Sequence, residues 1–136
     1  MTAHREAYDE VYAYTMGRDG FILQHVADAY GAQTATDVDK PIRVVFALAG
    51  LYLHLEKQFS GTEVQRAHMK MGQRKRPWPA IQLPADRGRV TAADVLAAPP
   101  GIERDRAIDE WCQSVWDAFR DHRQTIIELL REYQIS

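Results

Sequence analysis

Cysteine is almost absent from the sequence, which has a single one, Cys112, among 136 residues. One cysteine excludes an internal disulfide framework and a zinc finger, and it is typical of a protein from a reducing compartment. The first residues lack the apolar core of a signal peptide, and no apolar run reaches the roughly 20 residues of a membrane span. We therefore expect a cytoplasmic protein without a membrane partner.

An excess of charge of one sign is also lacking. The net charge is −2, with 26% charged and 46% apolar residues, which is typical of a globular protein and gives no overall reason to expect a nucleic-acid partner. There is no phosphate-binding glycine loop, no dinucleotide-binding fingerprint and no nucleophile elbow. With no complete catalytic motif, the sequence leaves open whether the protein is an enzyme.

The longest apolar stretch, residues 41–57, is the centre of the predicted fold. Between Val44 and Leu55 it contains one polar side chain, His54. A helix that is apolar on every side needs neighbours on every side, so this pattern indicates the central helix of a bundle. Pro41 is tolerated in the first turn of such a helix.

Apolar periodicity and capping residues predict the remaining helices. We expect them at residues 3–16, 20–33, 61–71, 92–98 and 102–133. Ser60 and Glu63 form a capping-box pattern at the start of the third of these. No stretch has a convincing strand pattern. We predict an all-α fold in one domain, residues 1–136, which is a compact four-helix-type bundle with one or two short extra helices.

One long segment, at about 73–90, breaks this helical pattern. It has no clear periodicity, and its three prolines keep the backbone extended. Irregular connections of this length are uncommon in compact domains and are often packed by their own side chains. We expect Trp78, Ile81 and Leu83 to pin the segment to the bundle.

The histidines are the first candidate site. His25, His54, His68 and His122 all fall on or beside apolar faces of predicted helices. Imidazole is a common ligand of divalent metals, and bundles build metal sites from facing helices. The short connector before residue 41 makes an antiparallel hairpin, which places His25 and His54 at similar heights. His25, His54 and His122, with His68 in reserve, are therefore candidate ligands of zinc, nickel, manganese or iron, and metal-bound water would be the nucleophile.

A plain structural role explains the same histidines equally well. The sequence has no His-x-x-x-His or Glu-x-x-His spacing, so each ligand would come from a separate helix. A buried histidine that bonds to a carboxylate or a backbone carbonyl satisfies each position without a metal. Asp28 and Glu56 are candidates for further ligands or for partners of the ligands.

A basic stretch, residues 66–78, is the second candidate site. Its cations are followed at once by an aromatic ring, and we single out Arg74, Lys75, Arg76 and Trp78. Cations beside an exposed ring can hold a phosphate-bearing ligand or a nucleic-acid strand. A solvated loop, balanced by acidic helix faces elsewhere, explains these residues better because the whole chain is slightly acidic.

The predicted last helix, residues 102–133, carries two further interpretations. Cys112 lies within its apolar stripe and is expected to behave as a small hydrophobic core residue. Trp116 and Phe119 belong to the core by default, but their exposure would signal a homodimer through this helix.

Four stretches of the chain carry a family resemblance. They are Phe21–Tyr30 (FILQHVADAY), Ala49–Glu56 (AGLYLHLE), Leu83–Leu96 (LPADRGRVTAADVL), and Trp111–Trp116 (WCQSVW) with Asp121 and His122. The chain resembles an uncharacterised bacterial family of small helical cytoplasmic proteins, a domain of unknown function. The resemblance implies the fold but no assigned chemistry. Family members often have a histidine shortly after Asp-Ala-Tyr. This chain has none in Gly31–Thr34, which implies the loss of part of any metal-binding set.

Three functional interpretations follow from the sequence. The first is a small cytoplasmic binding or interaction protein of unassigned role. The second is a metal-dependent enzyme of hydrolase or thiol-transfer type at the histidines, because the chain is similar in architecture to damage-inducible-type metal-binding four-helix bundles. The third is phosphate or nucleic-acid binding through the basic loop. The sequence identifies neither a substrate nor a partner.

Overall fold

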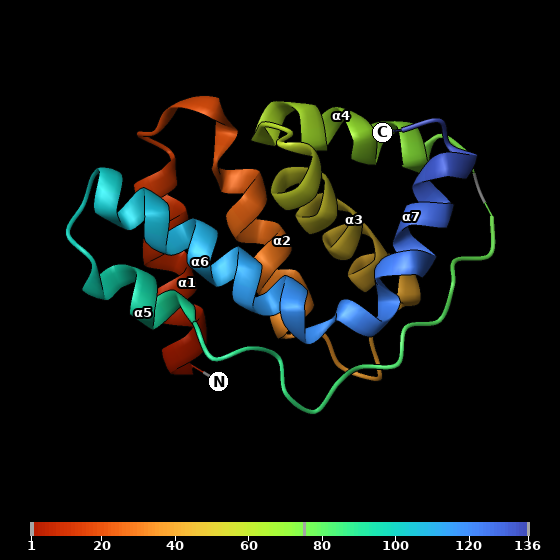
Figure 1. Cartoon of the computed structure of the whole chain (residues 1–136). Helices are drawn as coiled ribbons and strands as arrows, with labels where there is room; N and C mark the ends of the chain where they lie inside the picture. Colours follow the sequence, from red (N-terminus) through yellow and green to blue (C-terminus); the bar gives the residue numbers. More distant parts are fainter. Residues whose placement is uncertain (1, 75, 136) are drawn as a thin grey trace.

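A computed structural model describes residues 2–74 and 76–135 (Figure 1). The predicted all-α fold is confirmed, since no strand occurs in these two ranges. The elements are α1 (Thr2–Thr15), η1 (Asp19–Phe21), α2 (Leu23–Gln33), α3 (Pro41–Lys57), α4 (Gly61–Gly72), α5 (Ala92–Ala97), α6 (Ile102–Ala118), η2 (Arg120–His122) and α7 (Arg123–Glu132). None of the helices in the described ranges has the length and apolar content needed to cross a membrane.

Helix α3 is the central helix, as predicted, and spans the predicted residues 41–57. It contacts α2, α4, α6 and α7, and nine consecutive or near-consecutive side chains between Val44 and Leu53 are buried. Pro41 occupies its first turn, where the missing N–H is not needed. The helix ends at Lys57, and the next residue, Gln58, caps it with a left-handed φ of 61°. The apolar run therefore forms the middle of one hydrophobic core that includes side chains from the other helices.

The start of α4 confirms the predicted capping box. The Ser60 Oγ accepts a hydrogen bond from the Glu63 amide at 3.2 Å, and the Glu63 carboxylate accepts one from the Ser60 amide at 2.8 Å. The next position, Gly61, requires glycine, because a Cβ atom there would lie 1.8 Å from the carbonyl oxygen of Phe21. This close approach fixes the start of α4 against η1.

The prediction of one continuous last helix over residues 102–133 was wrong. Helix α6 ends at Ala118, and a 3₁₀ turn leads into α7 with a change of direction (Figure 1). Phe119 lies at the break and stays fully buried. The turn allows α7 to pack its apolar face against α3, whereas a straight helix would carry that face away from the core. Trp116 and Phe119 are both core residues, so neither provides the exposed aromatic face that would signal a dimer.

The predicted irregular segment at about 73–90 is confirmed. It runs along the outside of the bundle from α4, past α7, to α5 (Figure 1). Trp78, Ile81 and Leu83 pack against the core as expected. Arg87 anchors the segment to the C-terminal end of α2.

Arg87 supplies hydrogen bonds to backbone carbonyl groups that have no partner at the end of a helix. Its Nη1 donates to the carbonyl oxygens of Ala32, Gln33 and Ala35 at 3.3, 3.2 and 2.9 Å. Gln33 completes the anchor, because its Nε2 donates to the carbonyl of Val90 at 2.8 Å. The last carbonyls of a helix have no intrahelical partner, so these contacts supply one.

Candidate functional site

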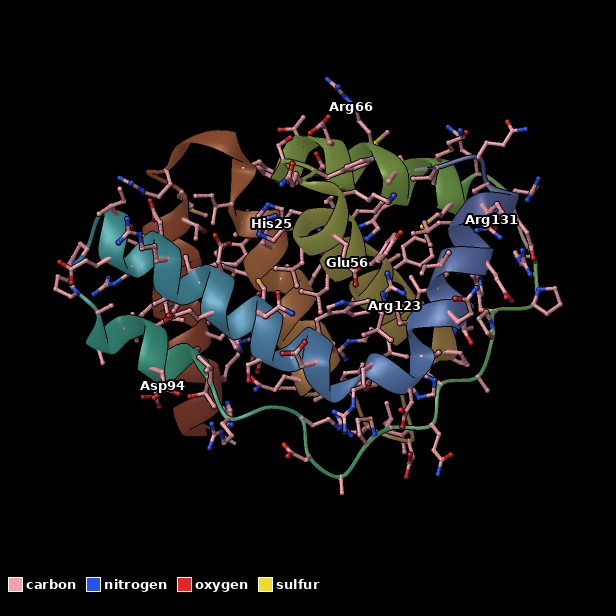
Figure 2. All side chains as sticks on the ribbon, in the orientation of Figure 1. His25, Glu56, Arg66, Asp94, Arg123 and Arg131 are labelled. Atoms are coloured by element: carbon pink, nitrogen blue, oxygen red, sulfur yellow. The ribbon has the colours of Figure 1, made fainter. Side chains whose placement is uncertain are left out.

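Two histidines meet between α2 and α3. The rings of His25 and His54 are stacked, with centroids 3.5 Å apart and an interplanar angle of 15°. The antiparallel hairpin of α2 and α3 brings them to the same height, as predicted from the short connector between the helices. Figure 2 shows His25 near the first turn of α2.

His54 is held at both ring nitrogens by acceptors. Its Nε2 lies 2.9 Å from Oδ1 of Asp109 on α6, and its Nδ1 lies 3.3 Å from the carbonyl oxygen of Phe59. A carbonyl and a carboxylate can only accept, so both contacts are satisfied together when both ring nitrogens carry a proton. The geometry therefore favours an imidazolium on His54 paired with the Asp109 carboxylate.

His25 has the opposite character. It is 5% exposed, and its Nδ1 has no hydrogen-bond partner among the residues that the structure describes. The pKa of His25 is lowered to about 3, mainly by burial and also by the charge on His54, while Asp109 opposes the shift. His25 is therefore a neutral imidazole stacked on a ring that its contacts favour as charged.

The histidine pair lines a cavity of about 640 Å³, which we call the His25 cavity. Its walls come from η1, the first turns of α2, the end of α3, the α3–α4 connection and α6. The lining residues are Gly20, Ile22, His25, His54, Leu55, Gln58, Phe59, Ser60, Asp105, Asp109, Glu110 and Gln113. The volume lies within the range of small-molecule sites, and the lining combines apolar side chains with a few polar groups.

The charged groups of the His25 cavity are mostly acidic. Asp109 and Glu110 are adjacent on α6, and Asp105 lies one turn before them. The Asp105 carboxylate is already bound, by Arg18 at 2.5 Å and by the Tyr14 hydroxyl at 2.7 Å. Asp109 and Glu110 therefore supply the negative charge that a ligand would meet.

The other two predicted histidines lie elsewhere. His68 donates through Nε2 to the carbonyl of Phe46 at 2.7 Å, and burial lowers its pKa. His122 donates through Nε2 to the carbonyl of Gln82 at 2.8 Å and so holds the irregular segment. Neither lines the His25 cavity. The structure therefore brings together two of the four candidate ligands, and no group of three or more His, Cys, Asp or Glu side chains in the described ranges could hold a metal ion.

Glu56, a candidate further ligand, forms a structural cluster instead. Its carboxylate accepts hydrogen bonds from Trp116 Nε1 at 2.8 Å and from Arg123 Nη2 at 2.6 Å (Figure 2). The bonds from Arg123 hold the pKa of Glu56 below its usual range, against the opposing effect of burial. This cluster ties α3 to α6 and α7.

The basic stretch packs against the end of α7. Arg74 donates to the carbonyl of Glu132 at 3.2 Å and lies 4.6 Å from the centre of the Tyr133 ring. Arg76 pairs with the Glu132 carboxylate, and Trp78 stacks on Tyr133 with centroids 6.1 Å apart. Lys75 lies outside the described residues. The described cations of this group therefore already have partners within the chain.

Asp109 is the site residue that sequence reasoning missed. Sequence reasoning singled out Cys112 on the same helix instead, which is buried, and burial raises the pKa of its thiol well above the usual value. Asp109 has no distinguishing sequence signal, because its contact with His54 depends on how α6 rotates against α3. The acidic pair Asp109–Glu110 on the polar side of the helix was the one available indication.

Comparison with known proteins places most of the chain in one family. A family model described as a family of unknown function (DUF5946) matches residues 5–120 and confirms the resemblance to a domain of unknown function. The matched range contains His25, His54 and Asp109. No curated protein and no solved structure matches the chain.

Proposed function

The chain belongs to the family of unknown function DUF5946, and on that premise we propose that it is a small cytoplasmic binding protein whose ligand occupies the His25 cavity. The cytoplasmic location is supported by the single cysteine, which is a buried thiol. The ligand that the cavity fits best is a small organic cation.

The unpartnered Nδ1 of His25 is the observation that carries this proposal. Leaving a buried polar atom without a hydrogen bond costs about 1–3 kcal/mol, and groups of this kind concentrate at functional sites. The ring of His25 contributes to the wall of the cavity, and its Nδ1 is covered by the surrounding side chains. A ligand that donates a hydrogen bond to this imidazole would recover the lost interaction.

The charge and shape of the cavity select the kind of ligand. Asp109 and Glu110 place two carboxylates in the lining, whose described residues include no arginine or lysine, so the balance favours a positive group. Ile22, Leu55 and Phe59 provide an apolar surface beside them. An alkyl chain that ends in an ammonium group satisfies both parts of the lining.

Isothermal titration calorimetry with three probes of equal chain length tests this proposal. We expect hexylamine to bind, and 1-hexanol and hexanoate to bind at least about tenfold more weakly, because a hydrogen-bonded charge contributes about 1.5–3 kcal/mol. Equal binding of hexanoate and hexylamine would contradict the proposal. Absence of hexylamine binding to the folded protein would also contradict it.

Two variants test whether hexylamine binds in the His25 cavity. Asp109→Asn removes a carboxylate whose side chain is 61% exposed, so the fold should persist while hexylamine affinity falls about tenfold. Asp117→Asn is the matched control, because Asp117 is an exposed residue of the same helix outside the His25 cavity. Equal losses in the two variants would show that the effect comes from the overall charge of α6.

A metal site is the second candidate function. The 2.9 Å between His54 Nε2 and Asp109 Oδ1 is a hydrogen-bond distance, so an ion with bonds of about 2.0–2.2 Å would bind both groups only after they move slightly apart and lose the shared proton. His25 is in ring contact with His54, but the described residues place no third donor where it could complete a metal site. A metal-dependent enzyme at this position would therefore need a rearrangement that brings a third ligand to His54 and Asp109, because His122 bonds to the carbonyl of Gln82 instead.

Elemental analysis of untagged protein distinguishes the two candidates. Near-stoichiometric zinc, nickel, manganese or iron that is lost in a folded His54→Ala variant supports the metal site. Protein that stays metal-free after incubation with zinc contradicts it.

A further inference from the structure

A second cavity, of about 490 Å³, lies between α1, α2, α3 and α4, and none of its lining residues belongs to the His25 cavity. We call it the Asp28 cavity. Its lining residues are Arg5, Tyr8, Gln24, Ala27, Asp28, Tyr30, Gly31, Ile42, Arg43, Phe46, Ala47 and His68. We propose that the Asp28 cavity binds a small planar organic acid, with Arg5 and Arg43 receiving its carboxylate and the Gln24–Asp28 pair meeting its polar substituents. This site does not depend on the function proposed above.

The polar groups of this cavity form a connected chain. Gln24 Nε2 donates to Asp28 Oδ1 at 3.0 Å and lies 3.5 Å from His68 Nδ1. His68 donates from its other nitrogen to the carbonyl of Phe46, so Nδ1 is the acceptor nitrogen of the ring. Each member is thereby oriented, as a binding site requires.

Among these hydrogen-bonded groups, Asp28 is the one whose burial is least favourable. It is 5% exposed, and its Oδ2 has no hydrogen-bond partner in the described residues. The backbone makes room for it, because a Cβ atom at Gly50 would lie 1.9 Å from that oxygen. Both the unpartnered atom and the glycine are unfavourable in a plain helical core, which favours a role for the carboxyl group.

Burial determines the charge of the cavity. It raises the pKa of Asp28 well above its usual value, against the effect of the Gln24 hydrogen bond, and it lowers the pKa of His68. Both shifts favour the neutral forms of these groups, and Arg5 and Arg43 are the charged groups among the other lining residues. The acids that pair with them, Asp9 and Asp39, are not lining residues.

The two arginines can exchange partners at low cost. Arg5 bonds to Asp9 at 3.0 Å and Arg43 bonds to Asp39 at 3.2 Å, both at the surface. Exposed pairs of this kind contribute little to stability, and a guanidinium has five N–H donors in a planar fork that suits a carboxylate. A bound carboxylate would therefore add to these contacts or replace them.

The aromatic lining is the reason to expect a planar ligand. The rings of Tyr8 and Tyr30 are stacked at 3.9 Å with an interplanar angle of 12°, and Phe46 lies on the facing helix α3. Ala27, Gly31 and Ala47 leave space beside these rings because their side chains are small. A flat ring would pack against these walls with little loss of conformational entropy.

Titration with 4-hydroxybenzoate tests the inference, with 4-hydroxybenzamide and hexanoate as the uncharged and the non-planar comparison. We expect 4-hydroxybenzoate to bind about tenfold more tightly than either. Equal binding of the amide would overturn the role of the arginines, and equal binding of hexanoate would overturn the selection for a planar ligand. No binding of 4-hydroxybenzoate to folded protein would overturn the site.

Variants locate the binding within the protein. Arg43→Gln should weaken 4-hydroxybenzoate about tenfold, whereas Arg66→Gln, at an exposed position of α4 outside the cavity (Figure 2), should leave it unchanged. Ala27→Leu should abolish binding by filling the space while it preserves the helix. Asp109→Asn should not change the affinity for 4-hydroxybenzoate, because Asp109 lines the His25 cavity and not the Asp28 cavity. Loss of binding in Arg66→Gln to the same extent as in Arg43→Gln would overturn the assignment.

Discussion

His25 and His54 form a parallel ring stack in which the contacts favour a charged ring beside a neutral one. The centroids are 3.5 Å apart, and the pKa of His25 is about 3 because burial and the neighbouring charge both disfavour its protonation. The Nε2 of His54 in turn lies 2.9 Å from Oδ1 of Asp109 on α6. The stability and the binding properties of this part of the molecule should therefore respond to pH.

The first prediction concerns acid stability and His25. Between about pH 3 and 6.5 the unfolded chain binds a proton at His25 that the folded protein does not, so the free energy of unfolding falls as the pH decreases in this window. One such group contributes up to about 1.4 kcal/mol per pH unit. The variant His25→Phe keeps a flat ring but loses the titrating group, so its urea-unfolding free energy should change less between pH 6.5 and 4.5.

The two proteins differ only at position 25, so the difference between the two slopes reports the contribution of His25. Parallel pH profiles for wild type and His25→Phe would contradict the assignment of a neutral, buried imidazole.

The second prediction concerns Asp28, for which the free energy of unfolding changes with pH in the opposite direction. Because burial raises its pKa in the folded protein, the stabilising contribution is complete below the unfolded value of about 4 and is lost as the pH rises. Asp28→Asn keeps the shape without the ionisation. We expect it to match wild type near pH 4 and to exceed it in stability at pH 8, by about 1 kcal/mol or more.

Thermal and urea unfolding at the two pH values measure this difference. Asp117→Asn serves as the control, because its carboxyl group is exposed and it should show no such gain. An Asp28→Asn variant that is less stable than wild type at pH 8 would show that Asp28 is ionised and paired.

The third prediction concerns the contact between Gly50 and Asp28. In Gly50→Ala the new Cβ atom would lie 1.9 Å from Asp28 Oδ2 and 3.1 Å from Val64 Cγ1. We expect a loss of about 1–3 kcal/mol from this overpacking, in spite of the higher helix propensity of alanine. Asp28→Ala should remove most of the clash, so the double variant should be more stable than the sum of the single effects predicts. Additive effects in the double-mutant cycle would contradict the contact.

The fourth prediction concerns the anchor of the irregular segment. Arg87→Ala removes the donor to three carbonyl oxygens at the end of α2 and should cost about 2–3 kcal/mol. Arg87→Lys should recover part of this loss, because an ammonium group cannot reproduce the planar fork. Hydrogen exchange measures the local effect: amides of residues 85–90 should exchange faster in Arg87→Ala. Unchanged exchange would show that the prolines and apolar contacts suffice.

The parts of the fold that follow from local sequence could be predicted. The limits of α3 follow from the apolar run after Pro41, and the start of α4 follows from the capping box of Ser60 and Glu63. The similar heights of His25 and His54 follow from the short connector alone. In each case the determining residues lie within a few positions of the feature that they determine.

The parts that depend on tertiary packing could not be predicted. The apolar spacing continues through Phe119 without interruption, so periodicity does not reveal the break between α6 and α7. The contacts of Asp109 with His54 and of Arg87 with the end of α2 join distant positions. These contacts depend on the rotation of each helix about its axis, and the apolar pattern constrains that rotation too loosely to pair individual side chains.

The anchors of the irregular segment also set an order of events during folding. The segment has no helical ladder of its own, and it is held by Gln33, Ser114 and His122, which lie on three elements distant from it in sequence. These contacts can form only after the elements that supply them are in place, so the segment should be absent from the folding nucleus. Changes at Arg87 should therefore accelerate unfolding and leave the folding rate nearly unchanged.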